Sequence, residues 1–203
     1  MRQLNIPMSK PFSQACENNQ QPILDVLKTA FADTRSVLEI GSGTGQHAVF
    51  LAANLPHLRW QTSDMPVHHP GINAWIDEFP SPDLIRPLSF TVGEDCWPES
   101  KFDGVFTANT THIMQVDEAR LMMQLVADNL PSGGVFCQYG PFNINGQYTS
   151  DSNQAFDQSL KSRGCGGIRD ISELRSWAEG RGLVLSRRYQ LPANNQLLEW
   201  RKR

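Results

Sequence analysis

The sequence predicts an α/β fold in which helices flank a mostly parallel sheet. Short apolar runs alternate along the chain with longer segments whose apolar residues recur at helical spacing. A glycine-rich turn joins the first apolar run directly to a helical pattern, which is typical of a strand-turn-helix unit. With 203 residues, of which 39% are hydrophobic and 19% charged, the chain is expected to form one domain over residues 1–203.

The glycine-rich turn predicts a binding site for a nucleotide-type cofactor. It follows the apolar run 36–40 and contains Gly41, Gly43 and Gly45, after which a helical pattern covers residues 48–55. Glycine permits positive φ angles and a close approach of a ligand to the backbone, and the free N–H groups at a helix start favour an electron-rich ligand. Glycines that serve packing alone are the alternative, but three in five residues after a buried strand favour a binding site.

The residues around this turn narrow the choice of cofactor. The dinucleotide fingerprint G-x-G-x-x-G needs glycine at its sixth position, where this chain has Gln46. Asp64 follows the predicted second strand, residues 58–63, and is expected to accept hydrogen bonds from both ribose hydroxyls. The same acid would serve NAD, so it does not discriminate between cofactors. A turn initiated by Asp64 before Pro66 is the alternative role.

The remaining elements are predicted from periodicity and turn residues. Residues 1–19 are polar and irregular, and Pro22 is expected to be the first residue of a helix. Asp117 is expected to cap the helix that follows it, and Asp170 with Glu173 predicts a capping box for the last helix. The other predictions are helices over 69–79 and 117–130, and strands over 88–92, 102–108, 135–139, 183–189 and 196–200.

The string E-I-G-S-G-T-G, from Glu39 to Gly45, resembles motif I of the class I S-adenosylmethionine (SAM) methyltransferases. In that family the glycines pass beneath the methionine and ribose parts of SAM, and the acidic residue helps to order the loop. F-D-G-V at residues 102–105 and P-S-G-G at 131–134 resemble the family's fourth strand and its entry to strand five.

The resemblance to class I methyltransferases implies both a fold and a cofactor. The fold is a Rossmann-like, mostly parallel sheet of seven strands in the order 3-2-1-4-5-7-6, with an antiparallel C-terminal hairpin. The cofactor is SAM, with S-adenosylhomocysteine as the product. The implied cofactor-binding residues are Glu39, Gly41, Ser42, Gly43, Gly45, Gln46, Asp64 and Asn109.

Five segments resemble the methyltransferase-like 26 family over nearly the whole chain. They are N-N-Q-Q-P-I-L, T-A-N-T-T-H-I, Y-G-P-F-N-I-N-G-Q-Y-T-S-D-S-N-Q-A-F-D, I-R-D-I and L-P-A-N-N. This resemblance implies a SAM-dependent methyltransferase but supplies no acceptor. The chain departs from the expected pattern at the polar segment S-Q-A-C-E-N-N. It departs also at Thr91, where many SAM enzymes carry an acid that contacts adenine; Glu94 or Asp95 is the alternative contact.

Asn109 and His112 are expected to lie nearest the chemistry, because the end of strand four borders the SAM methyl group and the acceptor in this family. His112 is interpreted as a general base with a pKa near neutrality, and Asn109 as a polar contact to the sulfonium or the acceptor. A buried, hydrogen-bonded histidine at the start of a helix is the alternative for His112. Catalysis by positioning and dehydration would need no strong base.

The acceptor is expected to be a small molecule, because only residues 8–20 and the loop 140–152 remain to recognise it. Both segments are expected to lie over the site. Aromatic walls with a few amides suit a small pocket, and a net charge of −3 gives no general attraction to nucleic acid. The predicted acceptor-binding residues are Asn18, Asn19, Tyr139, Phe142, Asn145 and Tyr148.

The chain shows no pattern of a signal peptide or a membrane span, so a cytoplasmic location without membrane contact is expected. Its four cysteines lie far apart without a C-x-x-C pair, which favours reduced thiols over disulfides or a metal site. Two alternatives to the methyltransferase stay open: a protein that binds SAM or S-adenosylhomocysteine without turnover, and a nicotinamide oxidoreductase, which Gln46 disfavours.

Overall fold

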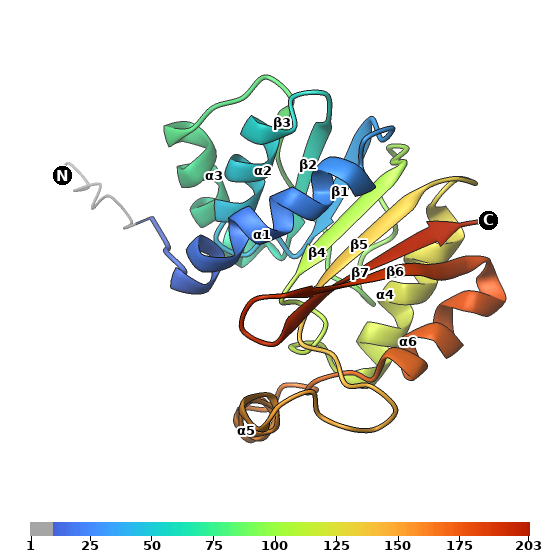
Figure 1. Cartoon of the computed structure of the whole chain (residues 1–203). Coiled ribbons are helices and arrows are strands. Elements are labelled where there is room, and N and C mark those ends of the chain that lie inside the picture. The colour runs from blue at the N-terminus through green and yellow to red at the C-terminus, as the bar shows by residue number, and fades with distance from the viewer. Residues whose placement is uncertain (1–9) are drawn as a thin grey trace.

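The computed structural model describes residues 10–203, and its seven strands form one sheet in the order β3-β2-β1-β4-β5-β7-β6 (Figure 1). Strands β1 to β5 pair in parallel, whereas β7 is antiparallel to both β5 and β6. The predicted strand order and C-terminal hairpin are therefore confirmed. The strands are β1 Ser36–Ile40, β2 Arg59–Asp64, β3 Leu84–Ser89, β4 Gly104–Ala108, β5 Val135–Gly140, β6 Leu183–Leu191 and β7 Asn195–Lys202.

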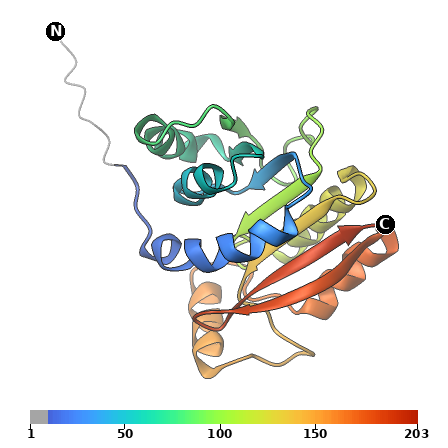
Figure 2. The same ribbon diagram turned by 45° about the horizontal axis from the view of Figure 1, so that its top comes forward.

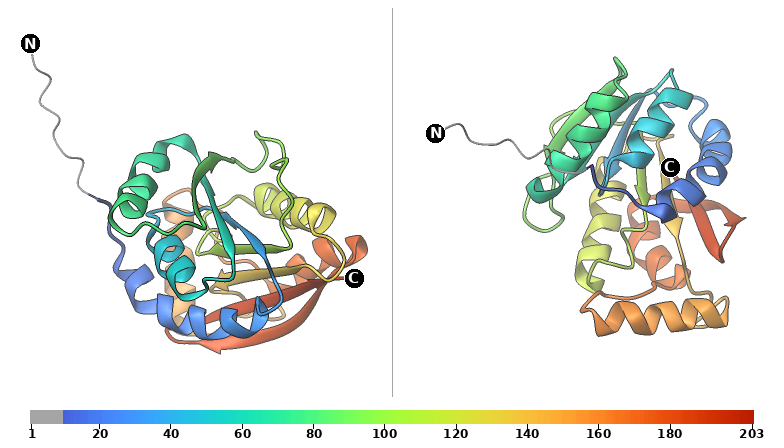
Figure 3. Two further views of the ribbon diagram at one scale, coloured as in Figure 1. Left: turned by 90° about the horizontal axis from the view of Figure 1, so that it is seen from above. Right: turned by 90° about the vertical axis from the view of Figure 1, so that its left-hand side faces the viewer.

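Helices cover both faces of the sheet (Figures 1 and 3). One face carries α1, α2 and α3, and the other carries α4 and α6. Figure 2 shows α1 running across the strands beside the C-terminal hairpin. The helices are α1 Gln14–Ala30, α2 Gln46–Asn54, α3 His69–Glu78, α4 Val116–Asn129, α5 Asp151–Ser162 and α6 Ile171–Ala178, with short 3-10 turns at Pro66–His68 and Glu179–Arg181.

The central strands are buried on both faces, which explains why they read as continuous apolar runs. Consecutive residues of a strand point to opposite faces. Phe106 of β4 accordingly packs with Trp60 beneath α1 to α3, while its neighbour Val105 packs with Met122 and Trp200 beneath α4 and α6. Helix α5 belongs to neither layer and lies at the carboxyl ends of the central strands (Figures 1 and 3).

Helix α1 corrects the prediction for the start of the chain. Residues 14–19 are helical, and Pro22 lies inside the helix instead of beginning it. Ser13 caps the helix, since its hydroxyl accepts a hydrogen bond from the N–H of Cys16. The apolar period starts only after Pro22, so the polar first turns carried no signal of helix. The part of the predicted irregular segment that falls on residues 1–9 lies outside the described residues.

Two further boundaries differ from the prediction. The third strand covers Leu84–Ser89 and not 88–92; it tolerates Pro87 because β3 is an edge strand. Helix α4 is capped by Gln115 and not by Asp117: the Gln115 N–H donates to the Glu118 carboxylate at 2.7 Å, which completes a capping box. The capping box of Asp170 and Glu173 is confirmed.

Within residues 10–203, no helix combines the length and the apolar character needed to cross a bilayer. The four cysteines lie as free thiols.

Candidate functional site

The three glycines of the turn after β1 all have positive φ, but their surroundings differ. The φ angles are 73° at Gly41, 56° at Gly43 and 89° at Gly45. A Cβ on Gly41 would lie 2.8 Å from the Thr110 hydroxyl oxygen, and one on Gly45 would lie 2.9 Å from the Ile72 Cα. A Cβ on Gly43 would meet nothing within 4 Å. The outer glycines therefore allow close packing, and the middle one leaves open space above the turn.

The turn is tied to the carboxyl end of β2. The Ser63 carbonyl accepts from the N–H groups of both Gly41 and Ser42, at 3.1 and 2.9 Å. The Asp64 carboxylate accepts from Gly43 N at 2.7 Å and, on its other oxygen, from Met65 N at 2.7 Å. Because a carboxylate oxygen has two acceptor positions, each oxygen of Asp64 keeps one for a ligand.

Glu39 supports the turn from below. Its buried carboxyl accepts from the Ser42 hydroxyl at 2.9 Å and from the Trp60 indole N–H at 3.0 Å. Burial raises the pKa of Glu39 to about 7, against the lowering effect of these two donors. The acid thus holds the serine of the turn and is half protonated near neutral pH.

Gln46 links the turn to the start of α1. Its side-chain oxygen accepts from Ser13 N at 2.5 Å, and its side-chain nitrogen donates to the Ser13 carbonyl at 3.3 Å. The amide that the resemblance assigns to the cofactor is therefore occupied by the N-terminal segment.

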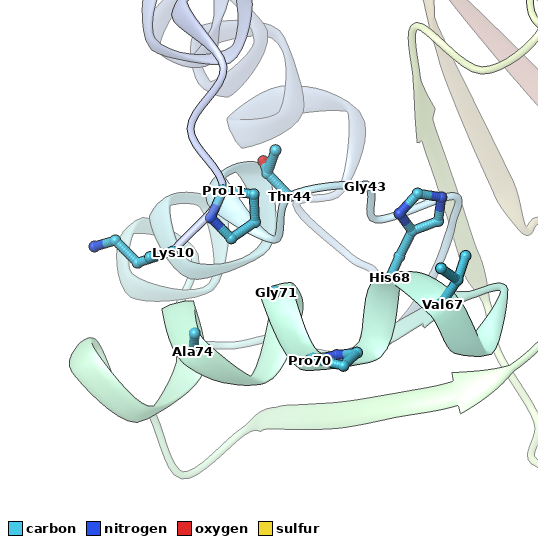
Figure 4. A pocket seen from close by; sticks show the side chains of 9 residues that line it. All are labelled: Lys10, Pro11, Gly43, Thr44, Val67, His68, Pro70, Gly71 and Ala74. Atoms are coloured by element: carbon cyan, nitrogen blue, oxygen red, sulfur yellow. The ribbon is translucent and has the colours of Figure 1, made fainter. Parts of the chain in front are cut away.

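A pocket of about 470 Å³ opens beside the turn (Figure 4). The first turns of α3 form one wall, and the N-terminal segment forms the opposite one. Trp75 holds this segment: its indole N–H donates to the Pro11 carbonyl at 2.7 Å, and the Lys10 ammonium lies 3.6 Å from the ring centroid. The lining residues are Lys10, Pro11, Gly43, Thr44, Val67, His68, Pro70, Gly71 and Ala74.

Polar side chains from the first turns of α1 lie next to a tyrosine at the end of β5. Asn19 bonds the His47 ring at 2.6 Å through its amide oxygen, and the Tyr139 hydroxyl lies beside the side chains of Asn19 and Asn195. Burial raises the pKa of Tyr139 and lowers that of His47 to about 4. The structure thus brings Asn19 and Tyr139 together, while Asn18 is exposed and bonds Gln14 at 2.9 Å.

Asn109 and His112 meet at the end of β5. A Cβ on Gly140 would lie 3.7 Å from His112 Nδ1 and 4.0 Å from Asn109 Oδ1. Asn109 has a φ of 57°, and its N–H donates to the Tyr139 carbonyl at 2.9 Å. Both predicted catalytic side chains therefore lie next to Gly140 at the end of β5.

The predicted pKa of His112 near neutrality is wrong. Burial, with a smaller contribution from the positive charge of Arg163, lowers the pKa of His112 to about 4. The imidazole is therefore neutral at physiological pH. The Phe156 ring of α5 meets it edge-on, with 5.4 Å between ring centroids. Sequence reasoning missed Phe156, because nothing in its spacing links α5 to the end of β4.

The loop 140–152 is more ordered than its composition suggests. Phe142 is buried in the core on the α4 side, and the Tyr148 hydroxyl donates to Asp157 at 2.6 Å. Asn145 lies at an exposed tight turn with a φ of 52°, and the next N–H, of Gly146, donates to Asp170 at 2.6 Å. These side chains hold the loop itself.

Solved structures of several methyltransferases share this fold. A SAM-dependent methyltransferase described as SibL, without ligand, has a TM-score of 0.77 at 19% identity and covers 93% of this chain and 55% of its own. An O-methyltransferase family 2 protein from Planctomyces limnophilus, in complex with apigenin, has a TM-score of 0.79 at 16% identity. The match covers 93% of this chain and 60% of that protein. Human N-acetylserotonin methyltransferase, in complex with SAM, has a TM-score of 0.78 at 14% identity. The match covers 93% of this chain and 53% of that protein.

The fold is that of the SAM-dependent methyltransferases, and the chain spans a little over half the length of these three proteins. The chain belongs to the family described as "Protein of unknown function (DUF938)", whose model matches residues 10–202.

Proposed function

We infer that the protein is a SAM-dependent methyltransferase that acts on a small-molecule acceptor. The observation that carries this inference is the glycine turn, which leaves open space above Gly43 next to Asp64. The turn lies beside the point where the strand order reverses, between β1 and β4, and ligands of open α/β sheets bind there. The resemblance to methyltransferase-like 26 proteins and the SAM-bound neighbour support the same inference.

The residues of the turn fit the cofactor. The free acceptor positions of Asp64 suit ribose hydroxyls, and the bare backbone at Gly43 lets a ligand lie against the turn. Glu39 holds the turn through Ser42 and does not need to touch the ligand. When bound, SAM supplies an electrophilic methyl group.

The residues at β4 and β5 orient the acceptor. A histidine with a pKa of about 4 is a weak base, so it does not efficiently remove a proton from the acceptor. His112 instead orients the acceptor by a hydrogen bond. Positioning for in-line attack and exclusion of water then supply the rate acceleration.

The experiment is calorimetric titration with SAM, S-adenosylhomocysteine and NAD. Asp64→Ala should weaken SAM binding about tenfold or more, since a hydrogen bond to a charged acceptor contributes about 1.5–3 kcal/mol. Asp117→Ala is the matched control, because the Asp117 side chain is 89% exposed on α4. Binding of NAD in preference to SAM would overturn the proposal.

A second candidate is a protein that binds SAM or its product without turnover. It is favoured by one observation, namely that His112 and Asn109 provide no strong base. Incubation with methyl-labelled SAM and a metabolite extract separates the two. Transfer of label to a small compound supports the enzyme, and binding without any transfer supports the second candidate.

A further inference from the structure

The pocket beside the glycine turn is bounded on one side by a segment without regular secondary structure. This segment, residues 10–13, precedes α1, and we refer to it as the strap. Lys10 and Pro11 of the strap line the pocket together with Gly43 and Thr44 of the turn (Figure 4). A ligand that lies in the open space at Gly43 therefore shares the pocket with the strap.

The strap connects the start of α2 to α3. At one end, the side-chain amide of Gln46, the first residue of α2, bonds both the N–H and the carbonyl of Ser13. At the other end, the Trp75 indole N–H of α3 donates to the Pro11 carbonyl at 2.7 Å, and the Lys10 ammonium lies over the Trp75 ring. The strap thus extends from the helix that begins at the turn to the helix that forms the other wall of the pocket.

Side chains of the two helices, and not their backbone, hold the strap. Among the described residues, no backbone–backbone hydrogen bond joins residues 10–12 to another segment. A further contact is the ion pair between Lys10 and Glu78, whose side chains are 26% and 54% exposed. Ion pairs at the surface contribute little to stability, so the strap can leave its place without breaking a strand or a helix.

One glycine of α3 makes room for the strap. Gly71 lies within this helix, where glycine is less favourable than alanine. A Cβ at this position would lie 2.6 Å from Pro11 Cγ and 3.1 Å from Pro11 Cδ, so any other residue would push the strap away from α3. The close contact of Pro11 with α3 therefore accounts for the glycine.

We propose that the strap closes the cofactor pocket and must separate from α3 each time SAM enters or S-adenosylhomocysteine leaves. This rests on the proposed function, which places SAM at Gly43. The contacts that hold the strap involve protein groups alone, so its opening precedes association as well as dissociation. Opening of such closing segments limits product release in many enzymes. Separation of Pro11 from α3 then sets how fast S-adenosylhomocysteine is exchanged for SAM.

The first test locks the strap with a disulfide. A Cβ at position 71 would lie 3.9 Å from Pro11 Cβ, and disulfides join Cβ atoms about 3.5–4.5 Å apart. The full chain with Pro11→Cys and Gly71→Cys should form this bond on oxidation, and Cys96→Ser removes the exposed native thiol. Surface plasmon resonance measures association and dissociation of S-adenosylhomocysteine. Both rates should fall about tenfold or more in the oxidised variant and recover with dithiothreitol.

The second test loosens the strap. Gly71→Ala adds a methyl group where Pro11 lies, and α3 stays folded because alanine favours a helix. Both rates should rise about fivefold or more while the Kd changes less than about threefold, since easier opening speeds entry and exit alike. Trp75→Phe removes the N–H donor but keeps a ring beneath Lys10, so it should act in the same direction with a smaller effect. Gly180→Ala is the matched control, because a Cβ there would meet nothing within 4 Å, and it should leave both rates unchanged.

The proposal is overturned if the oxidised disulfide variant exchanges S-adenosylhomocysteine at the wild-type rate, or if Gly71→Ala leaves the dissociation rate unchanged. It is also overturned if dissociation alone accelerates, since the strap would then be a contact to the ligand and not a closure. If mass spectrometry shows that the disulfide does not form, Gly71→Ala and Trp75→Phe decide. Any of these results with wild-type affinity for SAM leaves the methyltransferase proposal standing, whereas a wild-type chain that binds neither SAM nor S-adenosylhomocysteine removes both.

Discussion

The cofactor half and the acceptor half of the candidate site are built in different ways. In the cofactor half, the N–H groups of the turn after β1 donate to the neighbouring strand, namely to the Ser63 carbonyl and the Asp64 carboxylate. In the acceptor half, His112, Gly140 and Phe156 come from three separate segments, and the Phe156 ring packs edge-on against the His112 ring beside Gly140. A site made by one turn depends on backbone conformation, whereas a site made by distant segments depends on packing.

The largest expected effect comes from the backbone of the cofactor half. Gly45→Ala places a methyl group 2.9 Å from the Ile72 Cα at a φ of 89°. The strain and the overpacking together should lower the free energy of unfolding by about 2–5 kcal/mol. Gly43→Ala meets no neighbour and should cost only about 1–2 kcal/mol, yet weaken SAM binding because the methyl group enters the open space.

Urea unfolding and SAM titration of both glycine variants check this expectation. Equal loss of stability in the two variants would show that Gly45 is not packed as described. Unchanged SAM affinity in Gly43→Ala would mean that the ligand does not cross the turn.

The two halves should respond to pH in opposite directions. The pKa of Glu39 rises from 4.5 to about 7 in the folded protein, so the folded state holds a proton that the unfolded state has lost. Stability from Glu39 is complete below pH 4.5 and is lost as the pH rises to 7. Between these values the free energy of unfolding should fall by an amount on the order of 3 kcal/mol.

His112 has a pKa lowered from 6.5 to about 4, so its contribution is complete above pH 6.5 and is lost as the pH falls to 4. His47 acts in the same direction. Glu39→Gln and His112→Gln should each remove one of these slopes from the stability curve, as measured by urea unfolding across this range. Variant curves parallel to the wild-type curve would contradict both assignments.

The smallest expected effect concerns the contact between Gln46 and the backbone of Ser13, just before α1. Gln46→Leu removes both bonds to the backbone of Ser13, at a cost of about 1–2 kcal/mol. Amide hydrogen exchange should speed up at the first turn of α1 and stay unchanged at Leu27, which lies in the core. Equal acceleration at both places would mean that the whole helix opens as one unit.

The sequence predicted the backbone of the glycine turn better than the surroundings of His112, and the reason is physical. Glycine spacing encodes positive φ locally, so the turn at Gly41 to Gly45 and its position before Asp64 follow from a short string. The strand order was predicted from the order of strand and turn patterns along the chain together with the family resemblance. The start of α1 could not be predicted, because hydrogen bonds from the distant residues Gln46 and Trp75 hold the backbone at Ser13 and Pro11 just before the helix.

The acceptor half depends on contacts between residues far apart in the chain. The low pKa of His112 comes from its burial and from Arg163 beyond α5, and no local pattern contains either. Phe142 and Tyr148 looked like pocket residues because their segment has no apolar period. In the structure Phe142 fills the core, and Tyr148 bonds Asp157.

The two hydrogen bonds between the Gln46 amide and the Ser13 backbone would oppose a change in the ligand preference of the turn. A single change to glycine at position 46 would complete the dinucleotide fingerprint of the turn. The same change would delete the only side chain that joins the turn's helix to the Ser13 backbone, among the hydrogen bonds of residues 10–203. Such a change would thus loosen the start of α1 at Ser13, while Trp75 still holds Pro11. The ligand preference of the turn and the anchoring of Ser13 would therefore change together.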